Sequence, residues 1–84
     1  MNHNVWSVEI TDTFGGELNY SWLRRRTLLT PPALSRRSLV RRAKALMDWS
    51  NVPCVTAEYD GCIELRPRGM AQIMFITRQG YDAV

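Results

Sequence analysis

The chain has 84 residues, of which 45% are hydrophobic and 23% are charged, and its formal net charge is +3. This length supports a single domain over residues 1–84, and the apolar content argues against a disordered chain. No stretch approaches the roughly 20 apolar residues of a membrane helix, and the first residues lack the features of a signal peptide. We therefore expect a cytoplasmic protein without a membrane partner.

An alternating pattern over residues 5–11 predicts a half-buried strand with its apolar side chains on one face. The pattern resumes after two glycines and predicts a second strand, in a hairpin with the first. A three-residue loop with Gly15 in the left-handed conformation keeps the apolar residues on one face. A longer loop would shift the register by two and keep the same faces. The predicted pairs are Ile10 with Leu18, Val8 with Tyr20, and Trp6 with Trp22.

The segment 24–44 carries eight basic side chains and no acidic one, whereas the rest of the chain has three basic and eight acidic residues. The net charge therefore combines a strongly basic segment with an acidic remainder. We take the eight as candidate partner-binding residues: Arg24, Arg25, Arg26, Arg36, Arg37, Arg41, Arg42 and Lys44. The first three are expected to close the second strand, and the other five to lie on a helix.

The helix is predicted to follow Thr30-Pro31-Pro32, where proline lacks an N–H and restricts the preceding residue. Ser35 is the predicted N-cap, and residues 51–53 are expected to end the helix. Basic side chains at 37, 41 and 44 lie on the side opposite the apolar stripe. The predicted stripe consists of Leu39, Val40, Ala43, Leu46 and Met47.

The basic residues of this helix break local rules of helix stability. Arg36 and Arg37 lie in the first turn, where positive charge opposes the helix dipole at a cost of about 0.3–1 kcal/mol each. Arg37 and Arg41 are like charges four residues apart. Such conflicts are expected at functional sites, and arginines beside a helix N-terminus form a good anion site. A solvated helix face, a phosphate-binding surface and a surface for an acidic protein all remain open.

A second hairpin is predicted from residues 54–59 and 62–67, which flank an Asp-Gly dipeptide. Two turns are possible there. We prefer a type I turn with a glycine bulge, because it keeps the core face apolar. The tight two-residue turn pairs Ala57 with Glu64 and Tyr59 with Cys62, whereas the preferred bulged turn pairs Ala57 with Ile63 and Val55 with Leu65.

The preferred register places Cys54 and Cys62 on the outer face of the sheet, roughly 13 Å apart at about 3.3 Å per residue. A disulfide needs Cα atoms within about 7 Å, so we predict two free thiols. Two cysteines without further ligand residues provide no metal site, and no cofactor is expected.

The residues from Met70 to Thr77 form a nearly unbroken apolar run, which predicts a central strand or one covered on both faces. The chain after Thr77 is expected to trail off. The predicted element order is β-β-α-β-β-β. This describes an α+β fold, with an antiparallel sheet of four to five strands and one helix packed on one face.

The sequence offers little for catalysis. The only histidine, His3, falls in a segment that we expect to be frayed. Cys54 and Cys62 would need a depressed pKa to act as nucleophiles, and no histidine is adjacent to them. Asp12 and Glu17 flank the glycine turn, but two carboxylates do not make a site for a divalent cation. We therefore expect no enzymatic activity.

Three blocks of sequence carry a resemblance to a known group of proteins. They are Asp12-Thr-Phe-Gly-Gly-Glu-Leu-Asn-Tyr-Ser-Trp-Leu-Arg-Arg25, Val40-Arg-Arg-Ala-Lys-Ala-Leu46 and Glu64-Leu-Arg-Pro-Arg-Gly69. In these blocks the chain resembles a group of small proteins carried by proteobacterial phages and prophages. The resemblance implies a phage-borne accessory protein. Many phage proteins of this size and α+β build inhibit host defence, anti-CRISPR proteins among them.

The resulting hypothesis is a non-enzymatic inhibitor in the host cytoplasm that binds a host protein or ribonucleoprotein complex, such as a CRISPR effector, through its basic residues. Anti-CRISPR proteins that mimic DNA are typically acidic, so DNA mimicry is not expected of this basic chain. The alternative is a small nucleic-acid-binding or regulatory protein that uses the same residues. A structural phage component that self-associates through Met70–Ile76 is a third hypothesis.

Overall fold

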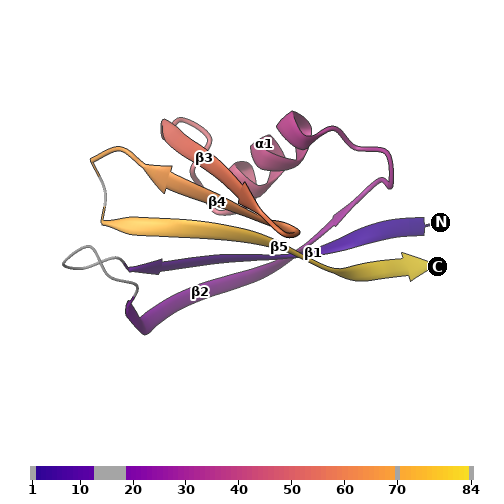
Figure 1. Cartoon of the computed structure of the whole chain (residues 1–84), viewed down its shortest axis with the longest axis horizontal. Coiled ribbons are helices and arrows are strands. Elements are labelled where there is room, and N and C mark those ends of the chain that lie inside the picture. The colour runs from indigo at the N-terminus through magenta and orange to yellow at the C-terminus, as the bar shows by residue number, and fades with distance from the viewer. Residues whose placement is uncertain (1, 13–18, 70, 84) are drawn as a thin grey trace.

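The computed structural model describes residues 2–12, 19–69 and 71–83 of the chain. In chain order the elements are β1 (Asn2–Asp12), β2 (Asn19–Thr30), α1 (Arg36–Leu46), β3 (Cys54–Tyr59), β4 (Cys62–Pro67) and β5 (Gln72–Ala83). The strands form one antiparallel sheet in the order β2-β1-β5-β4-β3, with α1 on one face (Figure 1). The predicted α+β class, an antiparallel sheet with one helix, is confirmed. Predictions for Gly15, Leu18 and Met70 fall outside the described residues.

The long strand β5 lies at the centre of the sheet, between β1 and β4. The prediction of a central strand is therefore confirmed for its described residues. The expectation that the chain trails off after Thr77 is wrong, because β5 continues to Ala83. It does so because the first residues of β1 provide a partner, with Asn2 opposite Ala83. The first residues of β1 and the last residues of β5 consequently lie side by side (Figure 1).

The hydrophobic core lies between α1 and the sheet. The sheet contributes apolar residues at alternate positions of three strands, and in β1 these are the residues that the alternation in the sequence predicts. The helix and the loop after it contribute the facing layer. The buried members of the core are Val8, Ile10, Ile63, Leu65, Met74 and Ile76 from the sheet, and Leu39, Ala43, Met47 and Trp49 from the helical side.

The first hairpin has a different register from the predicted one. Trp6 lies opposite Leu28 instead of Trp22, six positions further along β2. Strand β2 does not end at the three arginines. It continues to Thr30, because Leu28 packs against the core and Trp6 Nε1 donates a 2.9 Å hydrogen bond to Thr30 Oγ1. Long charged side chains are tolerated in β2 because it is an edge strand.

The second hairpin has the tight two-residue turn, so our preference for a bulged turn is wrong. Tyr59 lies opposite Cys62, and between them Asp60 and Gly61 have φ values of 24° and 81°. Positive φ at both positions is the type I′ pattern of tight hairpins. The bulged turn was preferred in order to give β3 an apolar core face. However, β3 is an edge strand without a fully buried side chain, so it does not need an apolar face toward the core.

The tight turn also decides where the cysteines lie. Cys54 is opposite Pro67 and packs against the core, whereas Cys62 lies on the other face of the sheet. There Thr77 Oγ1 donates a hydrogen bond to Cys62 Sγ at 3.6 Å. The prediction that both cysteines share the outer face is wrong, and the prediction of two free thiols is confirmed.

The helix α1 begins as predicted, after the two prolines. The Ser35 hydroxyl caps it by accepting a 3.2 Å hydrogen bond from the Ser38 N–H, with Ser35 itself in an extended conformation. Arg36 is the first helical residue, and the first turn contains no acidic side chain. No helix within the described residues is long and apolar enough to cross a membrane.

The helix ends at Leu46, earlier than the predicted end at residues 51–53. The Trp49 N–H bonds to the Lys44 carbonyl and the Asp48 N–H bonds to the Ala45 carbonyl, which together form a Schellman motif. Asp48 occupies the left-handed position of this motif, with φ 63°. The motif places Trp49 in the core, where the sequence pattern had not predicted it. Leu46, which we predicted in the apolar stripe, is 40% exposed.

Candidate anion-binding site

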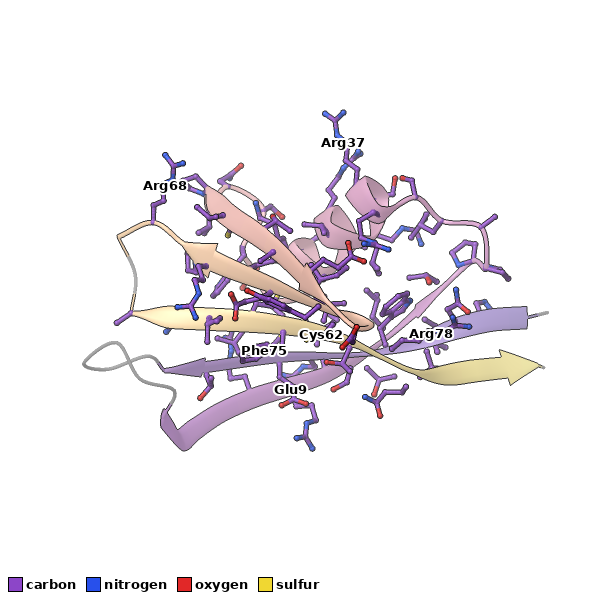
Figure 2. All side chains as sticks on the ribbon, viewed as in Figure 1. Glu9, Arg37, Cys62, Arg68, Phe75 and Arg78 are labelled. Atoms are coloured by element: carbon purple, nitrogen blue, oxygen red, sulfur yellow. The ribbon has the colours of Figure 1, made fainter. Side chains whose placement is uncertain are left out.

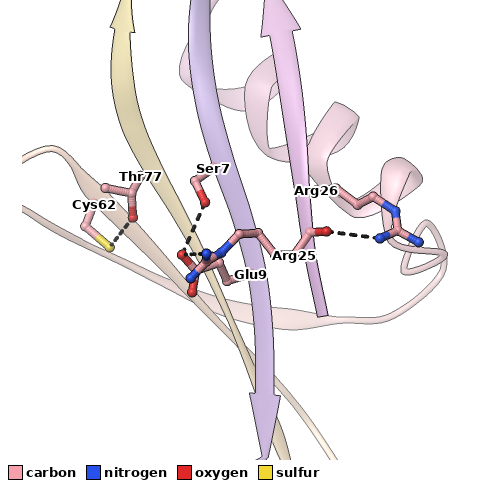
Figure 3. A network of polar contacts seen from close by, with 6 residues as sticks. All are labelled: Ser7, Glu9, Arg25, Arg26, Cys62 and Thr77. Atoms are coloured by element: carbon pink, nitrogen blue, oxygen red, sulfur yellow. Dashed lines mark hydrogen bonds and ion pairs between the residues drawn. The ribbon is translucent and has the colours of Figure 1, made fainter. Parts of the chain in front are cut away.

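The eight basic residues of segment 24–44 do not form one surface, because alternate residues of β2 point to opposite faces of the sheet. Arg25 lies on the face opposite α1. Its Nε is 3.3 Å from Glu9 Oε1, and Ser7 Oγ donates to the same oxygen at 3.2 Å. Figure 3 shows this network, with Arg25 and Arg26 on opposite sides of β2. The charge of Arg25 is therefore balanced within the protein.

Arg24 makes a structural contact that the sequence pattern did not predict. Its Nη2 donates a 3.1 Å hydrogen bond to the carbonyl of Met47, the C-cap residue of α1. Carbonyls at a helix C-terminus lack intrahelical donors and carry the negative end of the helix dipole, so a guanidinium group is favourable there. Arg24 thus links an edge strand to the end of the helix. Its position opposite Ile10, a core residue, directs it to this side of the sheet.

Arg26 and Arg36 are also engaged within the protein, although both remain exposed. Arg26 Nη1 donates a 3.0 Å hydrogen bond to the Arg25 carbonyl. Arg36 forms an ion pair with Glu58 of β3. This pair connects the first residue of α1 to the far edge of the sheet. It also offsets the unfavourable position of Arg36 at the positive end of the helix dipole.

Arg37, Arg41 and Lys44 form one row along α1, which we call the basic ridge. Their spacing of four and three residues places them on one side of the helix. That side is opposite the buried Leu39 and Ala43. Arg37 and Arg41 are exposed and Lys44 is half-buried. Figure 2 shows Arg37 projecting from α1 away from the sheet.

The basic ridge borders an open pocket of about 190 Å³. Its lining also includes Val40 of the helix and Ser50 of the loop that follows. The sequence pattern predicted neither residue as part of a site. Ser50 reaches the ridge because the chain turns at Asp48 immediately after the helix. A hollow lined by two arginines, a lysine and a serine offers side chains of the kind that bind an oxyanion such as a phosphate group.

No carboxylate among the described residues forms an ion pair with the basic ridge. Repulsion between its members costs a few tenths of a kcal/mol per i,i+4 pair, and binding of an anion would relieve it. Arg42 is also exposed and has no ion pair within the described ranges, but it does not line the pocket. The predicted set of eight therefore contains three residues that converge on one site.

A second pocket, of about 160 Å³, lies near the start of α1 and the turn between β3 and β4. Its charged lining is engaged within the protein. Arg36 is paired with Glu58, and Arg78 Nη2 donates a 3.3 Å hydrogen bond to Asn4 Oδ1. Because these groups already have partners, this pocket is a weaker candidate for an anion than the one beside the basic ridge.

The remaining candidates for chemistry are isolated side chains. His3 lies in strand β1 and not in a frayed end, and it is half-buried with no described partner for Nδ1. Burial raises the pKa of the Cys54 thiol, and the nearby Lys44 opposes this shift only in part, so Cys54 is not an activated thiolate. Among the described residues, no group of three His, Cys, Asp or Glu side chains could hold a metal ion.

Comparisons with protein-family models, with curated proteins and with solved structures found no match to this chain.

Proposed function

We propose that this protein is a non-enzymatic binding protein that docks a polyanionic macromolecule on the basic ridge. The observation that carries the proposal is that three cationic residues line one pocket and form no ion pair with a carboxylate in the described part of the chain. The site consists of the ridge residues together with Ser50 and Val40. The Arg24, Arg25 and Arg36 side chains are assigned to internal contacts instead.

The partner in this proposal is a host defence complex, and binding blocks one of its anionic surfaces. The resemblance to phage and prophage proteins supports a host partner and an inhibitory role of the anti-CRISPR kind. The ridge supports a partner that presents oxyanions, because arginine binds carboxylate and phosphate groups through its planar fork of donors. A ribonucleoprotein such as a CRISPR effector presents both kinds of group.

Capture from host lysate tests this proposal. The test protein carries Arg37→Glu, Arg41→Glu and Lys44→Glu, and the matched control carries Arg26→Glu, Arg42→Glu and Arg68→Glu. Both variants change the net charge equally. We expect the wild type and the control to recover one complex in a fixed ratio, and the ridge variant to lose it. Equal capture by both variants would exclude the ridge as the contact surface.

Direct nucleic-acid binding through the same ridge is the second candidate function. It is favoured by the presence of Ser50 with the three cationic residues in the pocket lining, because these residue types commonly contact phosphates. A salt titration with random duplex DNA and RNA distinguishes it. Three neutralised phosphates predict a log–log slope of about −3 on duplex DNA. No binding at low salt would exclude this candidate and leave a protein surface as the partner.

A further inference from the structure

The two edges of the sheet differ in how they are protected against pairing with another strand. The edge strand β2 carries three consecutive arginines, and charged side chains are a common protection of exposed edges. The other edge strand, β3, contains no Lys, Arg or Pro. We expected self-association through Met70–Ile76, but residues 72–76 belong to the central strand β5, which has a neighbouring strand on each side. The one charged side chain of β3, Glu58, is paired with Arg36, so β3 is the less protected edge.

The register of the β3–β4 hairpin shows which main-chain groups of β3 remain unpaired. Arg68 N–H donates a 3.1 Å hydrogen bond to the Pro53 carbonyl, which fixes position 53 as a bonded position of the ladder. Bonded and non-bonded positions alternate in an antiparallel pair. Positions 55, 57 and 59 are therefore bonded to β4. The main-chain groups of Thr56 and Glu58 point away from β4, to the outside of the sheet.

Around its central alanine, β3 has the same order of polar and apolar residue types when it is read from either end. Around Ala57 the strand reads Val-Thr-Ala-Glu-Tyr, with a polar residue on each side of the alanine and a large apolar residue beyond it. Val55 and Tyr59 lie on the face opposite α1, and they are 52% and 59% exposed. Thr56 and Glu58 are exposed as well. A strand of this pattern is complementary to a second copy of itself.

We propose that two copies of this chain pair through β3, antiparallel, about a two-fold axis at Ala57. Each Thr56 then lies opposite the partner's Glu58, so the outward main-chain groups of both strands bond one another. Val55 lies opposite the partner's Tyr59, and such aromatic–β-branched pairs are favourable. The two Glu58 side chains are not directly opposite one another, because each faces threonine, and each is already paired with Arg36 of its own chain. The two five-stranded sheets become one continuous sheet.

This pairing has a consequence that rests on the proposed function. A two-fold axis perpendicular to a sheet leaves both helices on the same face. The two basic ridges then face the same side of the dimer and can contact one extended anionic partner. Binding of two linked sites to one partner increases affinity without any new contact.

Self-association is measured by sedimentation equilibrium over a range of protein concentrations. The paired strands are short compared with a standard interface, so we expect a reversible dimer that approaches twice the 9.7 kDa chain mass as concentration rises. Thr56→Pro removes an outward N–H that β4 does not use, so it is expected to fold normally, as judged by thermal melting, and to remain a monomer. Thr56→Val keeps that N–H and is expected to dimerise. A wild type that stays monomeric at all soluble concentrations would overturn the proposal.

Cross-linking identifies the interface independently of the proline variant. Non-bonded partners in an antiparallel sheet have Cα atoms about 4.5 Å apart, which is within the range of a disulfide. In a Cys54→Ser, Cys62→Ser background, Ala57→Cys is therefore expected to form a covalent dimer under mild oxidation. Thr27→Cys, on the exposed opposite edge, is the control and should remain largely monomeric. Equal cross-linking at both positions would refute pairing through β3. Neither result depends on anion binding, so this proposal and the proposed function can fail separately.

Discussion

Arg24 and Arg25 are adjacent and chemically identical, yet the fold gives them different contacts. Arg24 points to the side of α1 and donates to the carbonyl of Met47, whereas Arg25 points to the other face and pairs with Glu9. A run of three arginines in a sequence suggests one patch of charge. In a strand, the alternation of side chains divides such a run between two faces.

The two contacts predict different stability effects. Arg24→Met removes a charged donor from a helix C-terminus, and we expect a loss of about 1 kcal/mol in the free energy of unfolding. Arg25→Met removes an ion pair that is largely exposed on the arginine side, and we expect a loss of less than about 0.5 kcal/mol. Urea denaturation of both variants measures the difference. Equal losses would contradict the structural role of Arg24.

At the scale of elements, α1 is well specified at its start and less so at its end. Two prolines and a serine cap predicted the start, because each acts on the local backbone. The end depends on Asp48 adopting a left-handed conformation that glycine adopts more readily. Without a glycine signal the sequence favoured a longer helix. The consequence was a core residue, Trp49, that could not be predicted from helical periodicity.

Asp48→Gly should therefore stabilise the protein. The substitution relieves a strained φ and removes a negative charge from the negative end of the helix dipole, and we expect a gain of about 1 kcal/mol. Asp48→Asn is the matched control, because it removes the charge and retains a side chain that tolerates the left-handed region. It should recover only part of the gain in thermal and urea denaturation. A lower stability of Asp48→Gly would show that the carboxylate makes a favourable contact.

The hairpins show why register was harder to predict than strand identity. Alternation predicted the strands and the core-facing side of Trp6, Val8 and Ile10 in β1. It did not fix which residues are opposite one another, because several registers keep the same faces. Leu28 and Thr30, the residues that fix the observed register, lie beyond the arginines where the strand was expected to end. In the second hairpin, the bulged turn was the wrong prediction because β3 is an edge strand and does not need an apolar face toward the core.

At the scale of the whole molecule, charge is distributed unevenly between the two sides. The sheet face opposite α1 carries the pairs Glu9–Arg25 and Glu64–Arg66, which balance within themselves. The outer side of α1 carries the basic ridge, which no described carboxylate balances. The sequence predicted the basic character of segment 24–44. It could not separate structural arginines from free ones, because that depends on partners distant in sequence, such as Glu58.

The central claim, that the basic ridge and not the whole basic segment binds anions, can be tested residue by residue. Titration of the folded protein with tripolyphosphate, followed by the NMR signals of the arginine Nε–H groups, reports each guanidinium separately. We predict shifts for Arg37 and Arg41, and little change for Arg25 and Arg36, whose carboxylate partners compete with the probe. Shifts of equal size in all four arginines, or larger shifts in the paired ones, would contradict the account.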